Sequence, residues 1–279
     1  MSQFTCNFMS YSLNTATTIS VILPGGGPMN QTHVIKEKFP VLYLLHGGFN
    51  DYSSWLRYTS VERYAEEHNL AVVTCSVMNS SYRNRVCLAK DRFAEQEAAF
   101  DAGAEERYFD FLEHELPEFV TSIFPVSTRP EDMYMAGLSM GGYGTILHGL
   151  LHPERFAALG FFSPMIFDRK CFQMTEADRQ ALSEEERRAL LLPELVEAAR
   201  QVKESGKCFP AIYLANGRND VREFAPVFAR LLAELGAPVT TDLDNKEFGH
   251  EWAFWDLVVK EFMDWLPRTD YYKDKRGRI

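Results

Sequence analysis

The stretch Met133-Tyr134-Met135-Ala136-Gly137-Leu138-Ser139-Met140-Gly141-Gly142-Tyr143-Gly144 decides the fold. Its apolar start predicts a buried strand, and Gly-x-Ser-x-Gly at 137–141 predicts a sharp turn into the helix that follows. Side chains at 137 and 141 would collide across such a turn, which explains the two glycines. Ordinary glycine-rich turns can contain the same pattern, so the interpretation of Ser139 as a nucleophile depends on the rest of the chain.

The composition fits one globular α/β domain. The chain has 279 residues, of which 46% are hydrophobic and 24% charged. A formal net charge of -10 argues against nucleic acid and anionic membrane surfaces as partners. The N-terminus lacks the features of a signal peptide, and no apolar run is long enough to span a membrane. The five cysteines are an odd number without paired spacing, which predicts a reduced, cytoplasmic protein.

Strand and helix patterns alternate along most of the chain. Two alternating segments, 5–11 and 17–23, predict antiparallel N-terminal strands. Continuous apolar runs then predict buried strands, and amphipathic helices separate them; these strands are expected at 39–45, 70–77, 133–136, 156–162, 210–215 and 238–243. Parallel strands need helical crossovers, so this alternation of strands and helices predicts a mainly parallel, doubly wound α/β sheet.

Four polar segments each follow a predicted strand. They are His46-Gly47-Gly48, Ser139, Asp220 and His250. In a parallel sheet the carboxyl ends of the strands share one edge, where active sites form. All four segments are therefore expected at the same edge, and this convergence supports a catalytic role for Ser139 more strongly than any single motif.

A serine nucleophile needs a base and an acid. The imidazole of His250, in the loop after the last strand, suits the base, and a carboxylate holds its tautomer. The order Ser139, Asp220, His250 is the order of α/β-hydrolase triads. Asp242 and Asp244 are alternative acids, but they lie so close to His250 that the loop would have to double back. The strand order favours Asp220.

The oxyanion of a tetrahedral intermediate needs preorganised donors. We expect one from the backbone N–H of Met140 and the second from Gly48. His46 is expected to shape the loop beside Gly48. His148 and His152 are four residues apart on one helix and could bind a metal, but no third ligand is evident. We therefore predict no metal and no cofactor.

Two segments interrupt this alternation of strands and helices. Residues 79–102 are a mixed-charge loop. Residues 169–207 are charged and helix-forming, with cap-like starts at Thr175 and Ser183, and are expected either as a helical cap insertion or as an ordinary solvated connection. Several aromatic side chains could line an apolar substrate pocket or simply pack in the core; they are Phe49, Trp55, Tyr82, Trp252 and Phe254.

The motifs together resemble one esterase family of α/β-hydrolases. They are Leu44-Leu45-His46-Gly47-Gly48 with Trp55, Gly137 to Gly144, Asn216-Gly217-Arg218-Asn219-Asp220, and Gly249-His250-Glu251-Trp252. The family includes tributyrin, feruloyl and acetylxylan esterases, S-formylglutathione hydrolases and mycolyltransferases. The likeness covers nearly the whole chain and is strongest to the small tributyrin-esterase-like carboxylesterases.

The resemblance implies a single α/β-hydrolase domain over 1–279 that acts as a serine carboxylesterase without a metal. It places the triad on Ser139, Asp220 and His250 and the oxyanion donors on Gly48 and Met140. Short-chain acyl, acetylated-sugar or hydroxycinnamoyl esters are the expected substrates, and members near this branch are often oligomeric. S-formylglutathione hydrolysis or acyl transfer on the same triad is the alternative activity. A non-catalytic binding protein on this fold is less favoured, because a decayed site would usually have lost a triad member.

Overall fold

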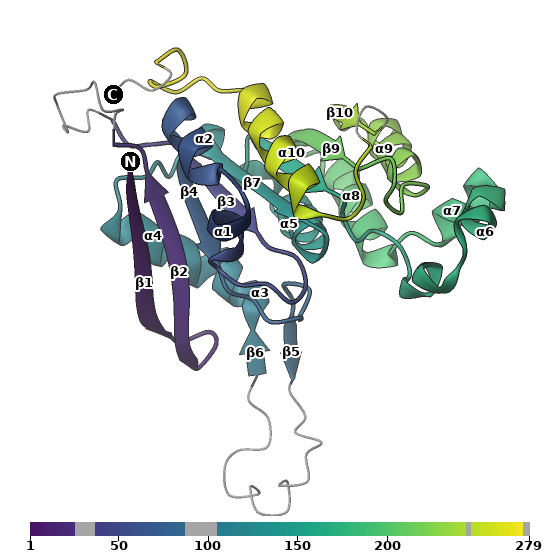
Figure 1. The fold of residues 1–279 in the computed structure, drawn as a ribbon, viewed down its shortest axis with the longest axis horizontal. Coiled ribbons are helices and arrows are strands. Elements are labelled where there is room, and N and C mark those ends of the chain that lie inside the picture. The colour runs from purple at the N-terminus through teal and green to yellow at the C-terminus, as the bar shows by residue number, and fades with distance from the viewer. Residues whose placement is uncertain (26–36, 87–104, 244–246, 276–279) are drawn as a thin grey trace, which may run out of the picture.

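The computed structural model describes residues 1–25, 37–86, 105–243 and 247–275. Its centre is an eight-stranded sheet in the order β1-β2-β4-β3-β7-β8-β9-β10 (Figure 1). The strands are β1 (Ser2–Ser10), β2 (Thr15–Leu23), β3 (Val41–Leu45), β4 (Ala71–Cys75), β7 (Met133–Leu138), β8 (Ala158–Phe162), β9 (Ala211–Ala215) and β10 (Val239–Asp242). Only the β1–β2 and β2–β4 pairs of this sheet are antiparallel. The predicted α/β fold with antiparallel N-terminal strands is confirmed.

The parallel strands end together. Leu45 pairs with Gly137, Gly137 with Phe161, and Phe162 with Ala215. Every residue of β3, β4, β7 and β8 is buried, as expected of strands that are covered on both faces. Because neighbouring strands share this register, the loops that follow them leave the sheet at one edge.

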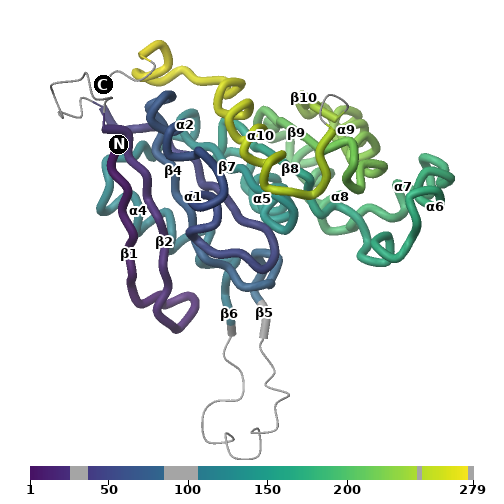
Figure 2. Tube along the Cα trace, in the orientation of Figure 1, coloured from purple at the N-terminus to yellow at the C-terminus, as the bar shows by residue number. Residues whose placement is uncertain are grey.

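Helices cover both faces of the sheet (Figures 1 and 2). One face packs against α1 (Ser54–Tyr58), α2 (Val61–His68) and α10 (Trp252–Trp265). The opposite face packs against α4 (Leu116–Ile123), α5 (Met140–Leu151), α8 (Pro193–Ser205) and α9 (Ala225–Glu234). Two separate apolar cores result, one on each side, which is the doubly wound arrangement.

The segment expected as a charged loop at 79–102 contains part of a small second sheet. β5 (Asn84–Val86) pairs antiparallel with β6 (Glu105–Arg107), and residues 87–102 of the expected loop lie outside the described residues. α3 (Tyr108–Asp110), a π-helical turn at Phe111–Glu115 and α4 follow one another along the chain. Pro117 lies in the first turn of α4, where a proline is tolerated.

The segment 169–207 forms a 3-10 helix at Arg169–Gln173 and then three α-helices with different surroundings. α6 (Glu176–Ala181) and α7 (Glu184–Ala189) begin with capping boxes on Thr175 and Ser183, as their sequence predicts. These two helices stand out from the end of the molecule in Figure 1. α8, by contrast, buries Leu195, Ala198, Ala199 and Val202 in the main core. α6 and α7, which have no buried residues, therefore project from the domain, whereas Cys171 before them is buried in the main core.

Candidate active site

Ser139 lies on a strained turn between β7 and α5. Its φ and ψ are 52° and -114°, outside the helix and strand regions, which costs a non-glycine residue on the order of 1–3 kcal/mol. The Ser139 N–H donates to Phe162 O at 3.0 Å, and the Met165 N–H donates to Ser139 O at 3.0 Å. These bonds from the end of β8 and the loop after it hold the turn in its strained conformation.

The two motif glycines allow three backbone segments to meet below Ser139. A Cβ on Gly137 would lie 2.5 Å from the Gly141 carbonyl, and one on Gly141 would lie 2.4 Å from Leu45 O. The predicted collision across the turn is therefore confirmed. Gly141 has a second constraint that the local motif does not reveal, because it also packs against the end of β3.

The loop after β3 lies directly beside the nucleophile. A Cβ on Gly47 would be 3.4 Å from the Ser139 Cβ. Phe49, two residues after Gly47, has a φ of 61°, and its N–H donates to Asn79 Oδ1 at 2.8 Å. Asn79, which the sequence did not single out, thus fixes the end of this loop. The expected donors therefore come from two segments that adjoin at Ser139: Gly48 in the loop and Met140 at the start of α5, where the first N–H groups lack helical partners.

His46 holds the loop and is not a base. The ring of His46 is buried and both of its nitrogens have partners. Nδ1 lies 2.6 Å from Gly47 O, and Nε2 accepts from the Val77 N–H at 3.0 Å. Nδ1 must carry the proton, because a carbonyl only accepts. Burial lowers the pKa of His46, which favours this neutral form. The ring thereby connects the loop to the chain after β4, as expected for a loop-shaping residue.

Asp220 and His250 meet in the folded chain. The His250 Nδ1–H donates to Asp220 Oδ2 at 2.8 Å. Asp220 Oδ1 accepts from the Val221 N–H at 2.6 Å, and the Asn219 N–H donates to Phe248 O at 2.9 Å, which ties the two loops together. Burial alone would raise the pKa of Asp220, but the hydrogen bond and charge of His250 bring it below its ordinary value. This carboxylate can hold an imidazole in one tautomer.

The alternative acids differ in their placement. Asp242 Oδ2 accepts from the Tyr213 hydroxyl at 3.2 Å. Asp244 lies outside the described residues. Within the described part of the chain, His250 hydrogen-bonds Asp220 and does not hydrogen-bond Ser139. Catalytic hydrogen bonds of free enzymes often tighten only with substrate, so this leaves His250 a candidate base.

The aromatic candidates for the pocket fall into two groups. Phe49 is 96% exposed and Trp252 is partly buried, with its ring stacked on Tyr58 at 5.0 Å. Trp55 and Tyr82, however, are 0% exposed. A lining role does not fit side chains without accessible surface, so for Trp55 and Tyr82 the pocket expectation is corrected: both pack in the core. Phe254 is buried as well.

His148 is not available to a metal. Its Nδ1 bonds to Glu113 and its Nε2 lies 2.9 Å from Tyr82 O, so both ring nitrogens are engaged. Over the described ranges, no group of three His, Cys, Asp or Glu residues is placed to hold a metal ion.

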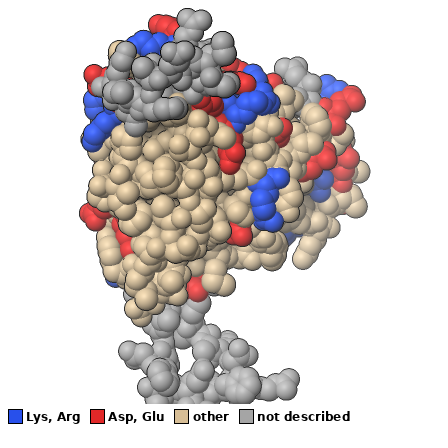
Figure 3. All heavy atoms as spheres, turned by 60° about the vertical axis from the view of Figure 1, so that its left-hand side comes forward, with Lys and Arg blue, Asp and Glu red and all other residues tan. Residues whose placement is uncertain are grey.

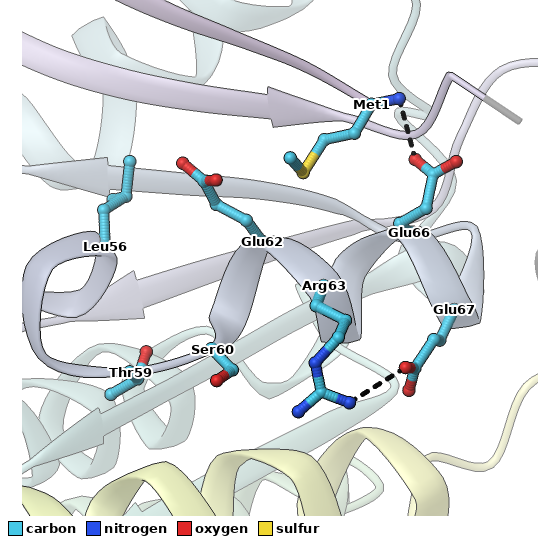
Figure 4. A pocket seen from close by; sticks show the side chains of 8 residues that line it. All are labelled: Met1, Leu56, Thr59, Ser60, Glu62, Arg63, Glu66 and Glu67. Carbon is cyan, nitrogen blue, oxygen red and sulfur yellow. Dashed lines mark hydrogen bonds and ion pairs between the residues drawn. The ribbon is translucent and has the colours of Figure 1, made fainter. Parts of the chain in front are cut away.

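A cavity elsewhere carries no comparable chemistry. It has a volume of about 410 Å³ and lies between the start of β1 and α2 (Figure 4). Two of its carboxylates are paired, Glu66 with the Met1 amine at 3.1 Å and Glu67 with Arg63 at 3.0 Å. The strained serine and the Asp220–His250 pair remain the best candidate for an active site.

The fold and this arrangement define a serine hydrolase of the α/β-hydrolase type. Comparison with known proteins identifies the family: residues 10–257 match the family model described as "Putative esterase", and the chain belongs to that family. It is 30% identical over 277 residues to an acetyl esterase of Caldicellulosiruptor saccharolyticus, covering 94% of this chain and 97% of that protein.

Solved structures agree with the family. One is FphF, a fluorophosphonate-binding serine hydrolase of Staphylococcus aureus, with a TM-score of 0.74, 25% identity and coverage of 95% of this chain and 98% of that one. Another is the S-formylglutathione hydrolase FrmB of the same organism, with a TM-score of 0.72, 24% identity and coverage of 95% and 98%, which supports the fold alone. The protein is a serine carboxylesterase.

Proposed function

We propose that this esterase hydrolyses short-chain acyl esters, acetyl esters first among them, through an acyl-enzyme on Ser139. The observation that carries the proposal is the Asp220–His250 hydrogen bond of 2.8 Å at the sheet edge where Ser139 is held in a strained turn. The acetyl esterase relative supports the acyl group.

In each half-reaction His250 acts first as a base and then as an acid. His250 takes the proton of the Ser139 hydroxyl while Oγ attacks the ester carbonyl carbon. The resulting oxyanion accepts from the Gly48 and Met140 N–H groups. His250 then gives its proton to the leaving alcohol, and the acyl group stays on Ser139. In the second half-reaction, His250 takes a proton from water, whose oxygen attacks the acyl carbon of the acyl-enzyme. The bond from that carbon to Ser139 Oγ then breaks, His250 returns the proton to Oγ, and the carboxylic acid leaves. The His250 side chain is 46% exposed, which gives water access to it.

Hydrolysis of p-nitrophenyl acetate by the wild type and by Ser139→Ala tests the nucleophile. The variant should lose at least about 10³-fold in kcat with an unchanged Tm. A fluorophosphonate probe should add to Ser139 in the wild type, as mass spectrometry of the digested protein would detect. Full activity of Ser139→Ala, or an adduct on another residue, would contradict the proposal.

A panel of ester substrates would define which acyl groups and which substrate class the enzyme prefers. Acetyl, butyryl and octanoyl p-nitrophenyl esters define the acyl length, and methyl ferulate, acetylated xylo-oligosaccharides and S-formylglutathione define the class. We expect the highest kcat/KM for acetyl esters. Product analysis with added alcohols separates hydrolysis from acyl transfer, because transfer would yield a new ester instead of the acid.

We also propose that the protein forms a homodimer through β1. The first 35 residues contain no Asp, Glu, Lys or Arg, although the chain has a net charge of -10. β1 is an edge strand, and Figure 3 shows a largely uncharged face on its side of the molecule. Two acidic copies can meet there without bringing like charges together. Sedimentation of the wild type should give a dimer and that of Thr5→Lys a monomer; identical monomers would contradict the proposal.

No helix in the described part of the chain is both long and apolar enough to cross a membrane. Cys6, Cys75, Cys171 and Cys208 are free thiols. Free cysteines favour a reducing compartment, and we propose the cytoplasm. Fractionation of cells that produce the protein would check the location.

A further inference from the structure

Tyr82 contacts both segments that supply the proposed oxyanion donors. Its hydroxyl donates to His46 O at 2.8 Å, on the loop that continues to Gly48. Its ring lies against α5, because a Cβ on Gly144 would be 2.7 Å from the ring atom Cδ2. α5 is the helix that begins with Met140. The side chain therefore spans the gap between the loop and the nucleophile helix.

A buried charge cluster holds the backbone of Tyr82. His148 Nε2 lies 2.9 Å from Tyr82 O, and its Nδ1 bonds to the Glu113 carboxylate. Both ring nitrogens are engaged, so the imidazole connects the backbone of Tyr82 to Glu113. Glu113 also accepts from Arg155. Burial opposes ionisation of Glu113, but His148 and Arg155 bring its pKa below the ordinary value.

The chain around Tyr82 adopts a costly conformation. Ser81 and Tyr82 have φ values of 55° and 56°, in the left-handed region that non-glycine residues rarely occupy. Such strain persists only where surrounding contacts determine the conformation. Here the contacts are the His148 bond to the carbonyl, the α5 surface against the ring, and His46 O at the hydroxyl.

We propose that Tyr82 is a positioning residue that sets the separation between the Gly48 and Met140 N–H groups. The inference rests on the proposed function for the identity of those donors. The physical reason is that the donors belong to different elements, and an oxyanion must lie about 2.7–3.1 Å from both. A displacement of the loop by about 1 Å can cost about 10²-fold in rate. A rigid, buried aromatic ring bonded at one end to the loop and packed on the helix prevents that displacement.

Tyr82→Phe tests the bridge with the least disturbance, because the ring stays over Gly144 and only the bond to His46 O is lost. The chain offers a matched control in Tyr43 on β3. Tyr43 is 2% exposed, and its hydroxyl is buried without a hydrogen-bond partner among the described residues. Tyr43→Phe removes the same atom from the same core, at a position where the part of the chain that the structure describes offers it no hydrogen-bond partner.

In Tyr82→Phe we expect kcat for p-nitrophenyl acetate to fall about 10-fold or more while KM changes less than about twofold, because the lost interaction acts in the transition state. Affinity for an aryl trifluoromethyl ketone, whose adduct with Ser139 is an oxyanion, should fall in parallel. Tyr43→Phe should match the wild type in both measurements. An equal loss of kcat in Tyr82→Phe and Tyr43→Phe would overturn the proposal. So would a Tyr82→Phe variant that changes in KM alone.

Amide hydrogen exchange gives a readout that does not depend on esterase activity. Exchange of residues 46–49 should be faster in Tyr82→Phe and unchanged in Tyr43→Phe. One outcome would reject the positioning role alone: the wild type hydrolyses the ester, Ser139→Ala does not, and Tyr82→Phe equals the wild type in kcat and in amide hydrogen exchange. The proposed function would then stand. If the wild type has no activity, the proposed function fails, and with it the catalytic meaning of the bridge. Exchange then still decides whether Tyr82 orders the loop.

Discussion

His250 Nδ1 lies 2.8 Å from Asp220 Oδ2, and the two side chains differ in exposure, 46% for the imidazole and 8% for the carboxylate. A shielded acid orients one side of the ring while its other side remains open to substrate and water. This asymmetry is what a serine hydrolase requires of its acid and base, because the acid stays fixed and the base exchanges protons.

Asp220→Asn should lower kcat/KM for p-nitrophenyl acetate by about 10²–10⁴-fold, because an amide cannot stabilise the imidazolium or hold the correct tautomer. The matched control is Asp242→Asn at the alternative acid, which bonds Tyr213. That variant should retain wild-type kinetics. Equal losses of kcat/KM in the two variants, or a loss confined to Asp242→Asn, would contradict the assignment of Asp220 as the catalytic acid.

The lowered pKa of Asp220 predicts how stability depends on pH. A carboxyl whose pKa is lower in the folded protein contributes stability above its unfolded value of 3.8 and loses it as the pH falls through the folded pKa. The wild type should therefore exceed Asp220→Asn in free energy of unfolding by a constant amount above about pH 5, and the difference should shrink below that. Urea titrations from pH 3 to 7 would measure this, and a difference that grows on acidification would contradict it.

Two glycines in the acid and base loops should respond oppositely to the same substitution. A Cβ on Gly217 would lie 2.3 Å from Phe248 O, so Gly217→Ala should separate the Asp220 and His250 loops and remove most of the activity. At Gly249 the nearest atoms are 3.8 Å from an added Cβ, so Gly249→Ala should fold and remain active although it adjoins His250. Activity and Tm of both variants check the prediction, and a tolerated Gly217→Ala would refute it.

Phe49 and Trp55 were both candidates for the substrate pocket, but their substitutions should have different effects. Phe49→Ala removes a 96% exposed ring and should change the free energy of unfolding by no more than about 0.5 kcal/mol. Its main effect should be on KM for aryl esters. Trp55→Ala removes a fully buried ring whose Nε1–H donates to Leu45 O at 3.1 Å, and should cost about 3–5 kcal/mol. Chemical denaturation of both variants measures the contrast. A large stability loss in Phe49→Ala would show that the ring is not free.

The sequence by itself determined the sheet and the edge where the site lies. Buried strands need apolar residues on both faces, so β3, β4, β7 and β8 are visible as continuous apolar runs. Gly137 and Gly141 mark a turn that no larger residue fits. Chain order then places Ser139, Asp220 and His250 after β7, β9 and β10. These constraints act on residues that are near one another in the chain, so the sequence alone is enough to predict them.

Only the tertiary structure decided which side chains face the solvent and which residues meet across the chain. Aromatic rings suit a pocket and a core equally, so the burial of Trp55 and Tyr82 had no local signal. The short β5–β6 pair and the π-helical turn before Pro117 depend on contacts that no periodicity reports. The bridge at Tyr82 joins His46, Gly144 and His148, because packing brings together residues that their positions in the sequence do not connect.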